Sequence, residues 1–343
     1  MFERVAAFWD LLRPRTIAQT RKTVDDLVAE VRELKRAQRD AAIDLRQQLD
    51  ALAVRESQLR AIWRADAEMA DEVPHLGAIL DGSRIAAHVE AAVAKSPLCE
   101  EPFPHAVIPN VVPRDFYDAL LRGIPPVELF ADRPFNKQQL TVPFAVAPLY
   151  SRLVWSYMTD VVIKTALMPA LVDKFRARLG AWIAANWPSL AENPLGPPVE
   201  LKTADGRILL RGRGYTIPPH RDPKWGFLTV ILYLARPKDS ETWGTQLYAV
   251  GDDEEARGPA PHWIDANRCR RSVDIPFRRN TALVLLNSTG AHGASIPEDA
   301  EPPDLQRYVY QFRIGPSSMA IRALTSLLPE DRRAFWEGKT SDY

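Results

Sequence analysis

Hydrophobic residues in the first part of the chain recur every three or four positions, and nothing there interrupts a helix. Residues 23 to 64 contain no Gly or Pro and consist mainly of Ala, Leu, Arg, Glu, Asp and Gln. This spacing is typical of the a and d positions of a coiled coil, here with a four-residue stutter after Leu45. We therefore predict a coiled-coil helix over residues 17–68 that joins copies of the chain into a homo-oligomer. The stripe consists of Val24, Leu27, Val31, Leu34, Gln38, Ala41 and Leu45.

A second interpretation of this helix stays open, because Gln38 and Ala41 are weak core residues. It would then be a solvated helix folded back on the rest of the chain. Residues 1–16 are predicted to be a short amphipathic segment, for which docking onto the protein itself is favoured over contact with a membrane interface. Residues 69–100 are predicted to be a helical linker.

The pattern changes after residue 100, where the last predicted domain, residues 101–343, begins. Helical spacing predicts helices over 113–123 and 151–186, and after residue 201 short β-branched runs between Gly and Pro predict strands, with a turn at 205–206. Together they favour an α+β fold, a double-stranded β-helix (jelly roll) buttressed by helices. The polar insert 250–274 is predicted to be a solvated loop, with a flap over a substrate site as the alternative.

Two of the predicted strands end in turns that carry candidate metal ligands. His220 and Asp222 follow a Gly- and Pro-rich turn and precede a hydrophobic strand. In an extended chain, residues two apart project from the same face, so the imidazole and the carboxylate converge on one point. His292 lies in a turn of small residues that follows the strand predicted at 281–286. We therefore predict a metal site of two histidines and one aspartate.

The chemistry of this ligand set favours one kind of metal centre. Two neutral imidazoles and one carboxylate on one face of an octahedral ion leave the opposite positions open, which is typical of non-haem Fe(II) oxygenases. Structural zinc instead prefers a closed tetrahedral shell, usually with Cys. The two cysteines of the chain, Cys99 and Cys269, form no Cys-rich zinc motif.

The order of these motifs resembles the Fe(II)/2-oxoglutarate-dependent oxygenase superfamily, and within it the prolyl-hydroxylase-like branch. The resemblance covers about residues 103–315 and rests on the H-x-D pair after a Gly/Pro turn, the distal histidine and the strand RYVYQFRIG. It implies Fe(II), 2-oxoglutarate and O2 as cofactor and cosubstrates. It also implies hydroxylation of a C–H bond with release of succinate and CO2.

The resemblance also implies which residues hold the cosubstrate. A basic residue on the strand after the distal histidine would bind the far carboxylate, and Arg307 occupies that place. Arg313 is the rival, since it shares a strand face with Arg307, and the gap from His292 to Arg307 is longer than is usual in the family. Tyr215 and Thr229 are further candidates on the cosubstrate side. In related halogenases a small residue replaces the carboxylate ligand, so Asp222 favours oxygenation.

The composition limits the binding partners and the location that can be expected. Lys and Arg together number 44, as do Asp and Glu, so the zero net charge gives no overall bias toward nucleic acid or an anionic membrane. The sequence contains no run of about 18 apolar residues, so we predict no transmembrane segment. Two cysteines favour a reducing, cytoplasmic location, which would also keep iron ferrous. The substrate is expected to be a small molecule or a protein side chain.

Two other functional classes stay open at this point. The chain could be a non-catalytic coiled-coil assembly protein whose jelly roll has lost activity. It could also be a cupin-type metal enzyme that does not use 2-oxoglutarate, in which case an arginine on the last strand would be incidental.

Overall fold

The computed structural model describes residues 14–251 and 262–337. The predicted amphipathic segment at residues 1–16 therefore lies almost entirely outside the described residues, as does the middle of the 250–274 insert. The chain divides into two compact units, Met1–Arg60 and Ala61–Tyr343. None of the helices in the described ranges combines the length and the hydropathy needed to cross a bilayer.

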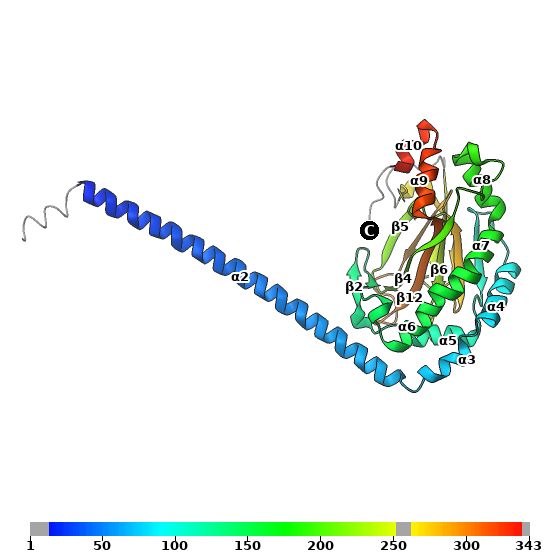
Figure 1. Ribbon diagram of the computed structural model, residues 1–343, viewed down its shortest axis with the longest axis horizontal. Coiled ribbons are helices and arrows are strands. Elements are labelled where there is room, and N and C mark those ends of the chain that lie inside the picture. The colour runs from blue at the N-terminus through cyan, green and yellow to red at the C-terminus, as the bar shows by residue number, and fades with distance from the viewer. Residues whose placement is uncertain (1–13, 252–261, 338–343) are drawn as a thin grey trace, which may run out of the picture. The chain divides into compact units, whose positions relative to one another are not determined.

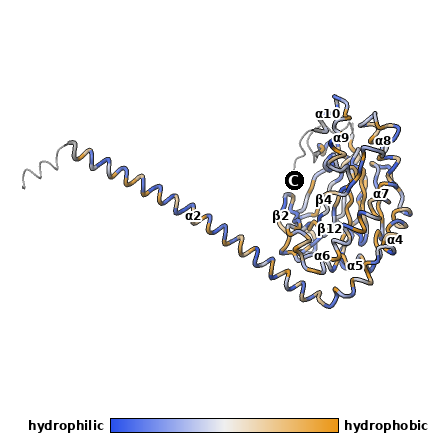
Figure 2. The backbone as a smooth tube through the Cα atoms, viewed as in Figure 1, coloured by the Kyte–Doolittle hydropathy of each residue, from blue (hydrophilic) through white to orange (hydrophobic). Residues whose placement is uncertain are grey.

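The described residues of the first unit, 14–60, all belong to one long helix, α2, Pro14–Met69. The predicted helix is thus confirmed, and it continues into the second unit. At 1.5 Å per residue its 56 residues extend over roughly 84 Å. Its apolar stripe is exposed, with Leu27 at 54% and Leu34 at 63% of full exposure, and Figure 2 shows hydrophobic positions recurring along it. The coiled coil itself stays a prediction.

The second unit begins with helices that lead into the sheets. Asp81 caps α4, accepting a hydrogen bond from the Arg84 backbone N–H at 3.1 Å. The helical run predicted at 151–186 is present, with a π-helical segment at Met158–Leu167 and a break at Phe175, rather than one uniform helix. The remaining helices are α3 Leu76–Ile79, α4 Gly82–Lys95, α5 Arg114–Arg122, α6 Leu149–Tyr157, α7 Met168–Lys174, α8 Arg176–Asn186, α9 Ser318–Ser326 and α10 Glu330–Glu337.

Two antiparallel sheets form the body of this unit. The larger has the strand order β1-β10-β6-β12-β4-β3-β2, and the smaller has the order β8-β5-β11-β7-β9. The alternation of strands between two facing sheets is that of a double-stranded β-helix. The strands are β1 His105–Pro109, β2 Phe130–Arg133, β3 Lys137–Leu140, β4 Leu201–Arg211, β5 Thr216–Arg221, β6 Leu228–Tyr233, β7 Thr245–Val250, β8 His262–Trp263, β9 Cys269–Ile275, β10 Thr281–Leu286, β11 Ala291–Ser295 and β12 Arg307–Pro316.

Each face of the larger sheet has its own core. Period-2 alternation sends Leu209 and Val309 inward, where they pack with Leu247 of the smaller sheet. The neighbouring residues Leu210 and Tyr310 point outward and pack against the helices. Figure 1 shows helices α4 to α8 covering this outer face. The predicted fold class, a jelly roll buttressed by helices, is confirmed.

Three local predictions need correction. The predicted loop at 250–274 contains β9, Cys269–Ile275, which pairs with β7 along the edge of the smaller sheet. The turn predicted at 205–206 is a register shift within the continuous strand β4. The hairpin of β2 and β3 extends the larger sheet and has no counterpart in the predicted elements.

Candidate metal centre

Neighbouring strands of the smaller sheet bring the two predicted histidines together. His220 of β5 lies directly opposite His292 of β11 in the strand register, and their ring centroids are 4.3 Å apart. Asp222 follows one residue after the end of β5. One ligand atom from each of the three side chains lies within 4.8 Å of the others. Three residues separated by up to 72 positions thus form one compact donor set.

The carboxylate of Asp222 is fixed by contacts on both oxygens. The Thr229 hydroxyl donates to Oδ2 at 2.6 Å, and the Arg313 guanidinium donates to Oδ1 at 3.1 Å. Oδ2 also lies 3.7 Å from Nε2 of His292. Burial by itself would raise the pKa of Asp222, but the charge of Arg313 and the neighbouring imidazoles reverse the effect and lower it. The carboxylate is therefore ionised, as a metal ligand must be.

Both imidazoles are held neutral, the other requirement for metal binding. Burial, with a further contribution from His292, lowers the pKa of His220 to about 3. Burial also lowers the pKa of His292. The Pro218 carbonyl, which can only accept, lies 2.9 Å from Nδ1 of His220. Nδ1 therefore carries the proton, and Nε2 carries the lone pair that can bind a metal.

Two details of the backbone hold the donor set in place. The Asn287 side-chain amide donates to three carbonyls of the turn after β5, those of Asp222 at 2.9 Å, Gly226 at 3.1 Å and Pro223 at 3.2 Å. Gly293 lets β11 approach β5 closely, since a Cβ there would lie 2.8 Å from the Ile217 carbonyl oxygen. The turn and the strand pair are thus set by residues adjacent to the ligands.

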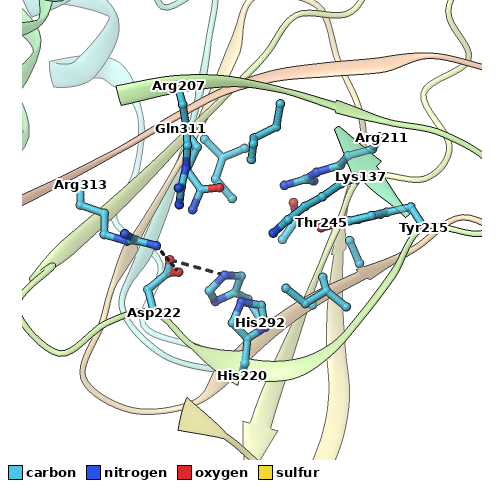
Figure 3. A pocket seen from close by; sticks show the side chains of 15 residues that line it. Lys137, Arg207, Arg211, Tyr215, His220, Asp222, Thr245, His292, Gln311 and Arg313 are labelled. Carbon is cyan, nitrogen blue, oxygen red and sulfur yellow. Dashed lines mark hydrogen bonds and ion pairs between the residues drawn. The ribbon is translucent and has the colours of Figure 1, made fainter. Parts of the chain in front are cut away.

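The donor set faces a cavity between the two sheets with an unusually basic lining. The space in front of the donor set has a volume of about 430 Å³, which includes space that is open to solvent. Figure 3 shows Lys137, Arg207, Arg211 and Arg313 pointing into the space that the histidines face. Asp222 is the single acidic residue among the described residues that line it. Neutral lining residues are Leu209, Tyr215, Ile217, Ile231, Thr245, Gly293, Ala294 and Gln311.

Of the four residues predicted to contact the cosubstrate, two line the cavity and two do not. Tyr215 lines the cavity, and the Arg211 guanidinium lies over its ring at 4.9 Å. Thr229 bonds to the Asp222 carboxylate and is not among the lining residues. Arg313, the rival of Arg307, does line the cavity.

Arg307 is fully buried but lies outside the cavity lining. Its guanidinium lies over the ring of Phe277 at 4.8 Å and 3.7 Å from a carboxylate oxygen of Asp239. Within the described ranges, none of its three guanidinium nitrogens has a hydrogen-bond partner. One inward-facing residue of the same strand, Val309, separates it from Gln311 at the cavity wall.

Sequence reasoning missed three basic residues of the cavity. Arg207 and Arg211 flank Leu209 at period 2 on a predicted strand, so their shared face could have been inferred from alternation. Lys137 lies on the unpredicted strand β3, directly opposite Arg211. The polar sequence KQQL offers no hydrophobic alternation that would have revealed that strand.

No family model and no curated protein matches this sequence. Several solved structures do match. The Pseudomonas putida prolyl-4-hydroxylase has a TM-score of 0.39 and 12% identity, over 67% of this chain and 99% of that one. HygX from Streptomyces hygroscopicus, solved with nickel, 2-oxoglutarate and hygromycin B, has a TM-score of 0.37 and 12% identity, over 62% and 83%.

A third similar structure is SnoK, a non-heme alpha-ketoglutarate-dependent carbocyclase from nogalamycin biosynthesis. Its TM-score is 0.36 at 12% identity, over 68% of this chain and 85% of that one. Function is inferred here from the geometry of this chain's own site.

Proposed function

We propose that this protein is an Fe(II)- and 2-oxoglutarate-dependent dioxygenase that hydroxylates a C–H bond and releases succinate and CO2. The observation that supports this most is the convergence of His220, Asp222 and His292 at a buried cavity. Two neutral imidazoles and one ionised carboxylate suit a ferrous ion and leave positions open for other ligands. The retained aspartate favours oxygenation over halogenation, and the substrate is a small molecule or a protein side chain.

The donor set and the cavity fit the proposed cofactors. When bound, Fe(II) and 2-oxoglutarate supply the activation of O2 and the oxidising power, while the protein supplies position and environment. Thr229 and Arg313 hold the Asp222 carboxylate in one orientation. The apolar side chains of Leu209 and Ile231 form part of the wall and keep that side of the cavity dry. The basic lining suits a dianionic cosubstrate.

An arginine of β12 is the proposed partner of the far carboxylate of 2-oxoglutarate. The resemblance favours Arg307, and a carboxylate would satisfy its buried guanidinium, which makes no hydrogen bond. Arg313 lines the cavity but already donates to Asp222. Calorimetric binding of 2-oxoglutarate to the Zn(II)-saturated protein separates the two. A weaker affinity in Arg307→Gln alone supports Arg307, whereas a loss confined to Arg313→Gln transfers the role.

Anaerobic purification followed by addition of Fe(II), 2-oxoglutarate and O2 tests the proposed reaction. We expect wild-type protein to form succinate and His220→Ala to form none, because the open metal site loses a ligand. His75→Ala is the matched control, since His75 is exposed and outside the cavity, and it should behave as wild type. Metal binding without 2-oxoglutarate binding or turnover would instead indicate a metal enzyme of another type. Absence of both would indicate a non-catalytic jelly roll.

The exposed stripe of α2 supports a second proposal, association with a second copy of the chain through this helix. Side chains such as Leu27, Val31 and Leu34 are about half exposed or more, and a three- and four-residue spacing sustained over many turns suits a coiled coil. Sedimentation of full-length protein tests this. Leu34→Asp should shift the mass toward the monomer, whereas Ala29→Asp, on the opposite side of the helix, should not. A wild-type monomer at all concentrations would contradict it.

The cytoplasm is the proposed location. The two cysteines, Cys99 and Cys269, do not form a disulfide in the structure, and a reducing compartment would keep both the thiols and a ferrous ion reduced. Fractionation of cells that express the protein, followed by thiol labelling, tests this. Recovery of the chain in an oxidising compartment would contradict it.

A further inference from the structure

Three residues after the metal ligand Asp222, in the turn between β5 and β6, the chain carries Trp225. The Gly226 backbone N–H closes this turn by donating to the Pro223 carbonyl at 2.8 Å. The side chain of Trp225 packs in the core between the larger sheet and the helices. One short turn therefore joins a carboxylate that faces the cavity to a large aromatic ring in a different part of the molecule.

Trp225 belongs to a group of aromatic side chains that we call the tryptophan cluster, which consists of Trp182, Trp187, Trp225 and Trp336. Trp182 lies in α8, Trp187 directly follows α8, and Trp336 lies in α10. The ring centroid of Trp336 lies 4.7 Å from that of Trp225 and 4.7 Å from that of Trp187. Aromatic pairs at such separations attract one another beyond the effect of buried area. The cluster therefore links the turn to α8 and α10.

Both C-terminal helices are attached to the tryptophan cluster. The Trp336 side chain is buried, and the Trp187 indole N–H donates to the Leu324 carbonyl of α9 at 2.9 Å. Figure 1 shows α9 and α10 at the same end of the sheets as α8. The ring of Trp336 lies closer to the Trp225 ring than the ring of Trp187 does, at 4.7 Å against 6.2 Å. The position of the Trp225 side chain therefore depends on α10.

The backbone around this turn has little room to absorb a displacement of Trp225. A Cβ added at Gly315 of β12 would overlap the Trp225 carbonyl oxygen. A Cβ added at Gly226 would lie 2.5 Å from Cδ of Arg313, whose guanidinium donates to the Asp222 carboxylate at 3.1 Å. Interiors that are packed this closely transmit strain. A shift of the Trp225 ring is therefore passed on to Asp222.

We infer that Trp336 is a positioning residue of the metal site, which acts through Trp225 on the turn that carries Asp222. Docking of α10 and binding of the metal are then coupled, and each favours the other. The inference rests on the metal site of the proposed function and deepens it by naming a residue that sets the metal affinity. Trp336 need not touch the metal, because the orientation of a ligand is enough to change metal affinity.

Chelator competition with Co(II) in full-length variants measures this effect. Trp336→Ala should weaken Co(II) binding roughly tenfold, as when a residue that orients a ligand is lost. Trp336→Phe should bind Co(II) as wild type, because an aromatic ring can still pack against Trp225. Trp155→Ala is the matched control, since Trp155 is a buried tryptophan of the same core that packs against Phe144 and Tyr310. It should lower the unfolding midpoint and leave the Co(II) affinity unchanged.

The possible outcomes separate this inference from the proposed function. Wild-type Co(II) affinity in Trp336→Ala would overturn the inference and leave the proposed function standing. Equal weakening in Trp155→Ala would also overturn it, because any cavity in this core would then have the same effect. Failure of the wild-type protein to bind Co(II) would overturn both. The expected affinities in a protein that does not bind 2-oxoglutarate would refute the proposed function and leave the inference standing.

Hydrogen exchange in the wild-type protein tests the coupling without any variant that could fail to fold. Because coupling is reciprocal, saturation with Zn(II) should slow exchange of the backbone amides of α10 by a similar factor, roughly tenfold. The amides of α5, which packs against α3 and α6, should exchange by local opening as in the metal-free protein. If Zn(II) does not slow exchange in α10, or slows it no more than in α5, the inference fails.

Discussion

A single methyl group added at Gly293 is predicted to disrupt the metal site without touching any ligand. A Cβ at this position would lie 2.8 Å from the Ile217 carbonyl oxygen, whereas ordinary contact begins at 3.4 Å. The two strands that pair His220 with His292 must therefore separate locally by about 0.6 Å, the difference between these distances. Metal–ligand distances tolerate only about 0.2 Å.

We expect Gly293→Ala to lower the free energy of unfolding by roughly 1–3 kcal/mol, the usual cost of overpacking. Metal affinity should fall on the order of 10–100-fold, as when a residue that orients a ligand is lost. Urea unfolding and chelator competition with Co(II) measure the two quantities. Gly77→Ala is the control, since a Cβ there meets nothing within 4 Å, and in helix α3 it should raise stability by about 0.5–1 kcal/mol. Wild-type metal affinity in Gly293→Ala would refute the reasoning.

Two further predictions concern the same metal site. Burial lowers the folded-state pKa of His220 from 6.5 to about 3. The metal-free protein should therefore lose stability as pH falls below 6.5, by at most about 1.4 kcal/mol per pH unit from this group. An equally steep dependence of stability on pH in His220→Asn would contradict this. Asn287→Ala frees the turn that carries Asp222 and should weaken Co(II) binding roughly tenfold; unchanged affinity would show that the turn is held by other contacts.

The metal ligands could be predicted from the sequence because their signal is local. His220 and Asp222 are two positions apart in an extended stretch, and His292 follows a hydrophobic strand in a turn of small residues. Alternation places each side chain on a face, and burial of that face follows from the neighbouring apolar residues. The long helix could also be predicted, because 42 consecutive residues without Gly or Pro favour a helix over other structures.

Positions that depend on strand register could not be predicted in the same way. Arg307, Gln311 and Arg313 share one face of β12, and only the pairing with β4 and β6, including a register shift between Gln311 and Arg313, decides which of them reaches the cavity. Alternation predicts which face of the strand a side chain lies on, but it does not predict which positions along the strand lie next to the cavity.

Two polar strands at or next to a sheet edge were missed for a related reason. Strand β9 has a largely exposed, charged sequence, CRRSVDI, that matches the pattern of a loop. Strand β3, with Lys137, is likewise polar and pairs with only part of β4. Both are defined by hydrogen bonds to neighbouring strands, and a hydrophobic pattern carries no information about such pairing.

Anomalous diffraction from crystals grown anaerobically with Mn(II) and 2-oxoglutarate tests the central claim most directly. The account predicts one metal peak per chain, within bonding distance of the Nε2 atom of His220, an imidazole nitrogen of His292 and an oxygen of Asp222, with 2-oxoglutarate completing the coordination from inside the basic cavity. A metal bound elsewhere, or a cavity in which 2-oxoglutarate does not reach the metal, would contradict it.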